Sequence, residues 1–127
     1  MAESPRSTEF VALGHPGAEH YDGLEAFANP GVTHVEMTSD ELTAVCPVTG
    51  YPDLYTATIE YRPAALCLES KSLKLYLSGF RNEAAFCEAL AVRIRADVAR
   101  ALDLEADKVR VRLVQKSRGG ITITATS

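Results

Sequence analysis

The sequence predicts an α+β fold in which two helices cover one face of an antiparallel sheet. Apolar and polar residues alternate within residues 32–62 and again after residue 108, which is the period of β-strands. Between these regions apolar residues recur every three or four positions, which is the period of helices with one buried face. The length of 127 residues suits one domain with a single core. The predicted order is therefore two strands, two helices and two strands.

The first part of the chain divides into a loop-like segment and two strands. Residues 1–31 are rich in proline and glycine and lack periodicity, so we predict an N-terminal arm or loop there and a domain over residues 32–127. Residues 32–37 alternate as a strand does. Residues 46–53 contain two prolines and a glycine, which predicts an ordered loop. A second strand is expected over residues 55–62, because its alternation stops at Pro63.

The second part of the sequence predicts the two helices and the last two strands. One helix is expected from an apolar stripe at helical spacing, formed by Leu73, Tyr76, Leu77 and Phe80. Asn82 is the predicted N-cap of a second helix that runs to about Leu102. Residues 109–113 and 121–124 alternate as strands on either side of a basic loop that contains Gly119. Because such a small sheet has two unprotected edges, we expect subunits to join edge to edge in a ring.

Composition and cysteine content exclude several classes of protein. Lys and Arg total 13 against 17 Asp and Glu, a net charge of −4, which disfavours broad binding to nucleic acid. The longest apolar run, residues 64–68, is too short to cross a membrane, and the start does not look like a secretory signal, so a cytoplasmic location is expected. Three cysteines at these spacings suit neither a disulfide framework nor a zinc site, so we expect free thiols and no metal.

Cys46 and Asp53 bracket the proline- and glycine-rich loop and are the candidate catalytic pair. A cysteine can attack an electrophilic carbon, and an aspartate nearby can deliver or remove a proton. Two structural interpretations compete with this one: Cys46 as a small buried apolar residue, and Asp53 as a turn residue after Pro52.

Three cationic residues and one acidic residue are further candidates for ligand binding. Lys71 and Lys74 lie near the start of the first helix, where free backbone N–H groups would help them to bind phosphate. Arg118 adds a fork-shaped donor, and Glu88 is able to accept hydrogen bonds from an N–H-rich heterocycle. The alternatives are solvated surface for the cations and a favourable position near a helix N-terminus for Glu88.

Several of these segments together resemble a known family. They are Cys46-Pro47-x-Thr49-Gly50-x-Pro52-Asp53, Glu69-Ser70-Lys71-Ser72-Leu73-Lys74-Leu75-Tyr76, Phe80-Arg81-Asn82 with Glu88, and Arg118-Gly119-Gly120-Ile121. In residue type and order they look like the NADPH-dependent 7-cyano-7-deazaguanine reductases of queuosine biosynthesis, over residues 32–124. The resemblance implies a tunnelling fold, in which ββααββ subunits form a barrel-shaped homo-oligomer, a decamer for example, with active sites between subunits.

The resemblance also implies an activity and roles for named residues. The nitrile of a small deazapurine would be reduced to an amine with two NADPH, through a thioimide on Cys46 and a proton from Asp53. Substrate-binding residues would be Glu69, Ser70, Phe86 and Glu88. Cofactor-binding residues would be Lys71, Ser72, Lys74, Arg118 and Gly119.

One departure from the family pattern leaves alternatives open. The family usually has histidine before the matching glutamate, whereas this chain has Cys87, either as part of the helix stripe or as a thiol able to form a reversible disulfide with Cys46. A relative that transfers an amine to a nitrile-bearing deazaguanine in tRNA is one alternative, although the NADPH-binding segment argues against it. A purine- or pterin-binding protein without turnover is another.

Overall fold

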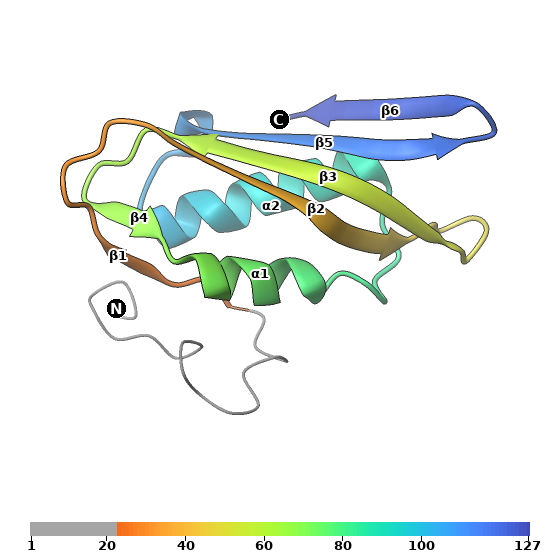
Figure 1. Cartoon of the computed structure of the whole chain (residues 1–127), viewed down its shortest axis with the longest axis horizontal. Coiled ribbons are helices and arrows are strands. Elements are labelled where there is room, and N and C mark those ends of the chain that lie inside the picture. The colour runs from red at the N-terminus through yellow and green to blue at the C-terminus, as the bar shows by residue number, and fades with distance from the viewer. Residues whose placement is uncertain (1–22) are drawn as a thin grey trace.

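A four-stranded antiparallel sheet forms one layer, and two helices lie across one of its faces (Figure 1). The computed structural model describes residues 23–127. Its elements are β1 (Ala26–Ala28), β2 (Val35–Val45), β3 (Pro52–Tyr61), β4 (Leu66–Leu68), α1 (Ser70–Ser78), α2 (Cys87–Leu102), the short 3₁₀ helix η3 (Ala106–Lys108), β5 (Val109–Arg118) and β6 (Ile121–Thr126). The order of the sheet is β2-β3-β5-β6, so the predicted α+β architecture is confirmed.

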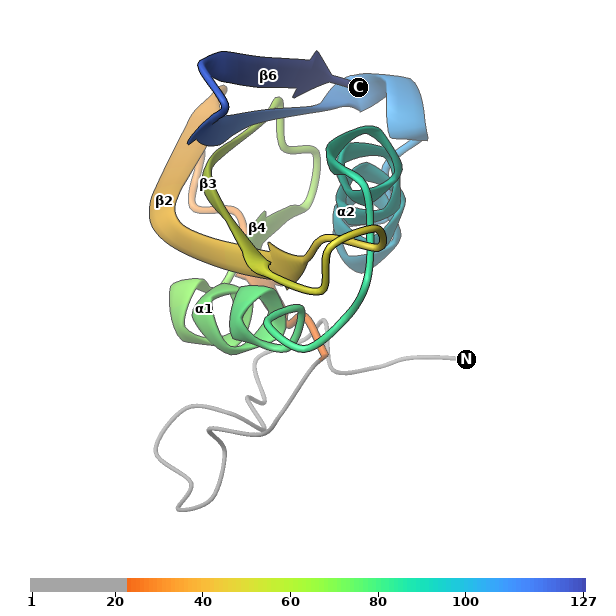
Figure 2. The ribbon, with the colours of Figure 1, turned by 90° about the vertical axis from the view of Figure 1, so that its right-hand side faces the viewer.

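The core lies between the sheet and the helices, as the end-on view shows (Figure 2). Alternate residues of β3 and β5 point inward and are buried, including Ile59 and Val111. The apolar stripe of α2, which contains Leu90, Ile94 and Val98, packs against them. Burial of these two matched faces is the main force that holds the layers together.

A two-stranded sheet of β1 and β4 was not predicted. Ala26 pairs with Leu68, and Ala28 with Leu66. Each strand has three residues, too few to show a period, and their pairing joins segments far apart in sequence. β1 lies within the stretch that the sequence predicts as arm or loop, while residues 1–22 of that stretch lie outside the described residues.

β2 begins at Val35, after the predicted start at residue 32, and extends well beyond the predicted end at residue 37. It pairs with β3 from Val35, opposite Tyr61, to Val45, opposite Pro52. The register shifts between Ser39 and Leu42, which marks a bulge. Because a bulge inserts an extra residue, it breaks the alternation that the sequence prediction depends on.

The prediction that Asn82 caps the second helix is wrong. α2 begins at Cys87, and its N-cap residue Phe86 makes no side-chain capping bond. The segment before it is extended instead: Val45 N–H donates to the Glu83 carbonyl at 2.9 Å, and Ala85 N–H donates to the Val45 carbonyl at 3.1 Å. This bridge to the end of β2 removes residues 83–85 from the helix and brings the start of α2 beside Cys46.

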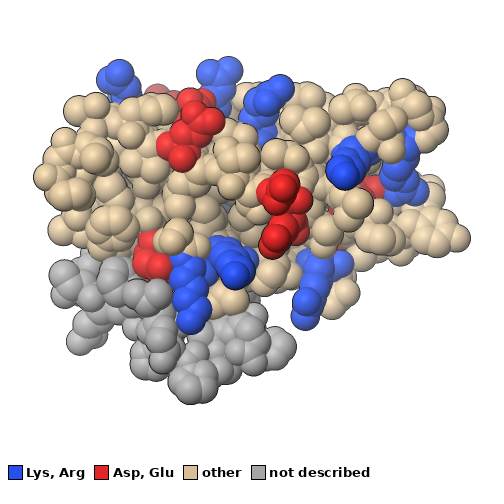
Figure 3. Space-filling view, viewed as in Figure 1, with Lys and Arg blue, Asp and Glu red and all other residues tan. Residues whose placement is uncertain are grey.

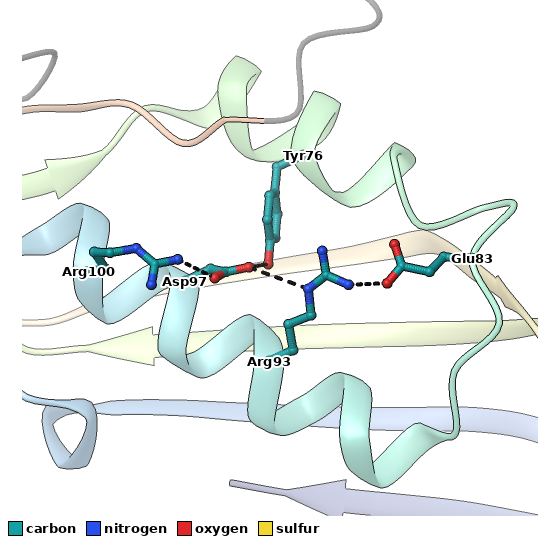
Figure 4. A network of polar contacts seen from close by, with 5 residues as sticks. All are labelled: Tyr76, Glu83, Arg93, Asp97 and Arg100. Carbon is teal, nitrogen blue, oxygen red and sulfur yellow. Dashed lines mark hydrogen bonds and ion pairs between the residues drawn. The ribbon is translucent and has the colours of Figure 1, made fainter.

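A polar network between the two helices supports this arrangement (Figure 4). The Tyr76 hydroxyl of α1 donates to the Asp97 carboxylate of α2 at 2.5 Å. Arg100 pairs with the same carboxylate, also at 2.5 Å, while Arg93 pairs with Glu83. The network therefore ties α1, α2 and the connecting segment together near the surface.

The described surface shows no large region of one charge on the face turned to the viewer, where Lys and Arg side chains are interspersed with Asp and Glu (Figure 3). Among the described helices, none combines the length and the apolar character that a membrane crossing requires.

Candidate active site

The turn between β2 and β3 is built by the sequence from Cys46 to Tyr51. Cys46 N–H donates to the Tyr51 carbonyl at 2.8 Å, and Gly50 N–H donates to the Cys46 carbonyl at 2.9 Å. Gly50 adopts a φ of 76°, which glycine tolerates without the steric penalty of a side chain. The Thr49 hydroxyl accepts from Tyr51 N–H at 3.2 Å. The turn holds the half-buried Cys46 at its base.

Cys46 is the cysteine whose thiolate form this turn favours. Its pKa is lowered from the ordinary value, first because the Thr49 side chain hydrogen-bonds the thiolate and then because the backbone of Thr49 and Val48 does so. Burial and the charge of Asp53 act weakly in the opposite direction. Since the thiolate is the nucleophilic form, these hydrogen bonds favour attack by Cys46.

The other two cysteines lie in settings that oppose ionisation. All three are free thiols, but Cys67 is 4% exposed and Cys87 is 2% exposed. Burial raises the pKa of Cys67, and burial together with the charge of Glu88 raises the pKa of Cys87 to about 11. Cys87 is therefore protonated at neutral pH and packs in the helix stripe.

Asp53 lies next to this turn and is paired with a cation from the other end of the chain. It is 4% exposed at the start of β3. β3 and β5 are antiparallel neighbours, so the end of β5 comes beside the start of β3. There the Arg118 guanidinium forms an ion pair with Asp53 and also donates to the Thr49 hydroxyl at 3.3 Å. The structure thus brings Cys46, Asp53 and Arg118 together through Thr49.

Two predicted substrate-binding residues lie at the start of α2, beside the same turn. Phe86 is 53% exposed and Glu88 is exposed in the first turn of α2. Figure 2 shows the turn between β2 and β3 in front of the sheet, against the segment that leads into α2. A flat heterocycle near Cys46 would therefore meet an aromatic ring and a carboxylate.

Tyr55 lies close to Asp53 in the chain and has a hydroxyl, unpartnered within residues 23–127, that the sequence did not indicate. It follows Asp53 by two positions on the inward face of β3 and is 2% exposed. Its hydroxyl oxygen is buried and makes no hydrogen bond within the described part of the chain. Burial raises the pKa of Tyr55, and so do the charges of Cys87, Asp53, Cys46 and Glu88. An inward aromatic residue in an alternating strand indicates core, so the sequence held no signal for a role here.

The remaining predicted residues lie on α1. Glu69 is 7% exposed and caps the helix, accepting from Ser72 N–H at 2.6 Å and from Lys71 N–H at 2.8 Å. The expectation that these backbone N–H groups are free for phosphate is therefore wrong. Ser72 is fully buried: its hydroxyl accepts from Glu25 N–H at 3.0 Å and donates to the Glu69 carbonyl at 2.9 Å. Ser72 supports the helix start in this structure.

Lys74 and Ser70 line a groove between α1 and β2. The groove has a volume of about 620 Å³, and Leu73, Leu77 and Ile59 form part of its apolar lining. Lys71 is half-buried near the start of the same helix, three residues from Lys74. Lys74 therefore provides a donor for phosphate next to a surface on which a ring can lie, and Lys71 adds a second cation near the start of the helix.

The predicted residues form two groups within one chain. One group surrounds the turn between β2 and β3, with Arg118 and Gly119 at the tip of the β5–β6 hairpin, where Gly119 has a φ of 59°. The other group lies along α1. This helix begins beside β4, toward the end of the sheet opposite the turn between β2 and β3 (Figure 1). The structure therefore does not bring Glu69, Ser70 and Lys71 to Cys46 in a single chain. No cluster of His, Cys, Asp and Glu suited to a metal ion occurs in residues 23–127.

Comparisons with known proteins show the family of this chain. A family model described as QueF-like protein matches residues 52–127. A protein of Frankia casuarinae named NADPH-dependent 7-cyano-7-deazaguanine reductase is 42% identical over 116 residues, which cover 91% of each chain. One of the same name from Chloroherpeton thalassium is 41% identical over 107 residues, covering 82% of this chain and 90% of that one.

A solved structure bears on the fold. The crystal structure of the archaeosine synthase QueF-Like in the apo form matches with a TM-score of 0.68 at 20% identity, covering 76% of this chain and 93% of that one. The two proteins share their fold, and the predicted tunnelling-fold subunit is confirmed.

Proposed function

Since this chain belongs to the QueF-like family of NADPH-dependent 7-cyano-7-deazaguanine reductases, we propose that it reduces the nitrile of 7-cyano-7-deazaguanine to an aminomethyl group with two NADPH, as a step of tRNA queuosine biosynthesis. The observation that carries this proposal is that one turn holds Cys46, a thiol of lowered pKa, at its base and is followed directly by the buried carboxyl group of Asp53 at the start of β3. A nitrile needs such a pair, because it is a weak electrophile until a nucleophile adds to its carbon and a proton reaches its nitrogen.

Cys46 performs the covalent step. Its thiolate forms a bond to the nitrile carbon, one π pair of the C≡N bond moves to nitrogen, and Asp53 supplies the proton that gives a neutral thioimide. Bound NADPH supplies the hydride for each reduction. After the first hydride has added to the thioimide carbon, the C–S bond breaks and Cys46 leaves as a thiolate, which gives the imine that accepts the second hydride and a proton from solvent. The hydrogen bonds from Thr49 therefore assist the departure of Cys46 as well as its attack.

Arg118 links Asp53 to cofactor binding. In the ion pair the Asp53 carboxylate accepts hydrogen bonds from the Arg118 guanidinium. Arg118 is also a residue that family resemblance assigns to the phosphates of NADPH. We infer that phosphate and carboxylate compete for the same guanidinium, so that a bound cofactor draws Arg118 away from Asp53.

The remaining contacts would come from both groups of residues. Glu88 and Phe86 would bind the deazaguanine next to Cys46. Lys74 would hold phosphate beside the apolar groove, and Lys71 would hold phosphate near the start of α1. Glu69 caps the start of α1, which lies beside β4, whereas the turn between β2 and β3 lies toward the other end of the sheet (Figure 1). We therefore propose a homo-oligomer in which Glu69 of one subunit completes the site around Cys46 of another. Ser72 would take part by fixing the start of α1.

The test is to mix the purified chain with 7-cyano-7-deazaguanine and follow the absorbance of NADPH and the mass of the protein. We expect two NADPH consumed per substrate, and a covalent adduct when NADPH is left out. Cys46→Ala should abolish both. Cys67→Ala, which removes a buried thiol on β4, is the matched control and should retain both.

Two outcomes would contradict the proposal. An adduct that persists in Cys46→Ala would remove the proposed nucleophile. A stable adduct of the unaltered protein without oxidation of NADPH would instead favour amine transfer or binding without turnover.

A further inference from the structure

We propose that the Tyr55 hydroxyl is a further catalytic group of this site and donates a hydrogen bond to the nitrile-derived nitrogen of the substrate bound to Cys46. The inference rests on the proposed function and adds to it a residue that neither the sequence motifs nor the family comparison identified.

The first observation is an unpartnered polar group in the interior. Tyr55 is 2% exposed, and its hydroxyl makes no hydrogen bond with any residue in the range 23–127. A buried hydroxyl without a partner lowers stability, and such groups in folded proteins commonly have a functional or ligand-related explanation. The missing partner is therefore expected to arrive with the ligand.

Tyr61 shows that the fold is able to satisfy a buried tyrosine on this strand. It lies on the same inward face of β3 and has the same 2% exposure, but its hydroxyl accepts from Leu68 N–H at 2.8 Å. Size, strand and burial thus match between Tyr55 and Tyr61. They differ in whether the protein itself supplies the hydrogen-bond partner.

The second observation is where the Tyr55 hydroxyl lies. Tyr55 and Asp53 are two residues apart on the inward face of β3, so their side chains are neighbours on that face. They lie opposite Leu42 and Ala44 of β2, the strand that ends at Val45, next to Cys46. The charges of Cys87, Asp53, Cys46 and Glu88 act on the hydroxyl, in agreement with this placement. Tyr55 therefore lies on the buried side of the turn that carries Cys46.

The chemistry of these neighbours determines which partner is missing. Asp53 is already paired with Arg118, and the buried Cys87 is a protonated thiol that accepts hydrogen bonds weakly. Burial raises the pKa of Tyr55, so the hydroxyl keeps its proton and acts as a donor. The nitrile nitrogen is a hydrogen-bond acceptor at the end of a slender linear group. Such a group is able to enter a narrow space that excludes a ring.

The hydrogen bond from Tyr55 would act when negative charge develops on the nitrogen of the substrate. As the Cys46 sulfur bonds to carbon, a π pair moves to nitrogen, and the negative charge there is stabilised by a donor already in place. The nitrogen takes its proton from Asp53, and Tyr55 retains its own. Electrons and protons thus balance without a further reactant.

The experiment compares Tyr55→Phe with Tyr61→Phe, each of which removes one oxygen from the same face of β3. For each variant the melting temperature is measured without ligands, and the rate of adduct formation with 7-cyano-7-deazaguanine is measured by mass. Tyr55→Phe should leave the melting temperature unchanged or raise it, and slow adduct formation by about tenfold or more. Tyr61→Phe should lower the melting temperature by about 3 °C or more and leave the rate unchanged.

Two results would overturn the inference. One is adduct formation by Tyr55→Phe at the rate of the unaltered protein. The other is a fall in its melting temperature as large as that of Tyr61→Phe, because the hydroxyl would then have a partner in the ligand-free protein. An unaltered protein that forms no adduct at all would refute the proposed function instead, which separates the two failures.

Discussion

Replacing Arg118 with glutamine removes the cation that pairs with Asp53 while keeping a side chain of similar length. The Asp53 side chain is 6% exposed and that of Arg118 is 39% exposed, so the pair lies between a surface and a buried ion pair. Exposed pairs contribute about 0–1 kcal/mol, and removing one partner of a buried pair costs about 3–5 kcal/mol. We therefore expect Arg118→Gln to lower the free energy of unfolding by about 2 kcal/mol.

A double-mutant cycle with Asp53→Asn isolates the pair from other effects of each change. The free energies are measured by urea unfolding at one protein concentration, because an oligomer makes stability depend on concentration. The double variant should be more stable than the sum of the single changes by about 1–2 kcal/mol, since a neutral amide in place of the carboxylate leaves no unpaired charge. Arg112→Gln, an exposed arginine on the same strand, is the control and should change stability by less than about 0.5 kcal/mol. A coupling below about 0.3 kcal/mol would refute the reasoning.

The same cycle tests whether NADPH and Asp53 compete for Arg118. Asp53→Asn removes the internal competitor, so it should lower the dissociation constant of NADPH. If about 1 kcal/mol of the coupling is released, the change is about fivefold. Fluorescence titration of NADPH without substrate measures it. Unchanged or weaker binding would show that the ion pair and the cofactor do not share the guanidinium.

Three further predictions address the thiolate, the cofactor and the assembly. Thr49→Val removes the leading cause of the lowered pKa of Cys46, so the pH midpoint of its alkylation by iodoacetamide should move upward; an unmoved midpoint would assign the shift to other groups. Lys71→Ala together with Lys74→Ala should raise the apparent KM for NADPH far more than they lower kcat, and an unchanged KM would leave both as ordinary surface charges. Mixing inactive Cys46→Ala and Glu69→Gln subunits should restore part of the activity after subunit exchange, whereas a mixture that stays inactive would contradict a site shared between chains.

The sequence predicted the fold best where one face of a long element is buried. The stripe of α2 and the alternation of β3 each span enough residues for their period to be read, and both elements exist in the structure. β1 and β4 have three residues each, and the bulge in β2 interrupts its alternation, so local pattern carried little information there. Asn82 failed as a cap because residues 83–85 hydrogen-bond to Val45, a contact that is not local in sequence.

The site shows the same division between local and distant determinants. Cys46 and Asp53 are seven residues apart across one turn. The two prolines and the glycine within residues 46–53 predicted that both would lie at the ends of a loop. The pairing of Asp53 with Arg118 spans 65 residues and depends on β3 and β5 being neighbours, which periodicity does not specify. Glu69 was expected to bind substrate, and that role remains a prediction, but its carboxylate also caps α1.

The polar groups of this site differ in how the ligand-free chain satisfies them, and that difference suggests an order of events. Asp53 is paired with Arg118, and Glu69 accepts from N–H groups of α1, so a ligand that binds either carboxylate as proposed would compete with the protein for it. Tyr55 has no such partner among the described residues, so a hydrogen bond to substrate would displace nothing. Binding to Tyr55 therefore lacks the competing cost that binding to Asp53 or Glu69 carries. On this reasoning the nitrile should orient against Tyr55 first, and release of Asp53 from Arg118 should follow when the cofactor phosphates arrive.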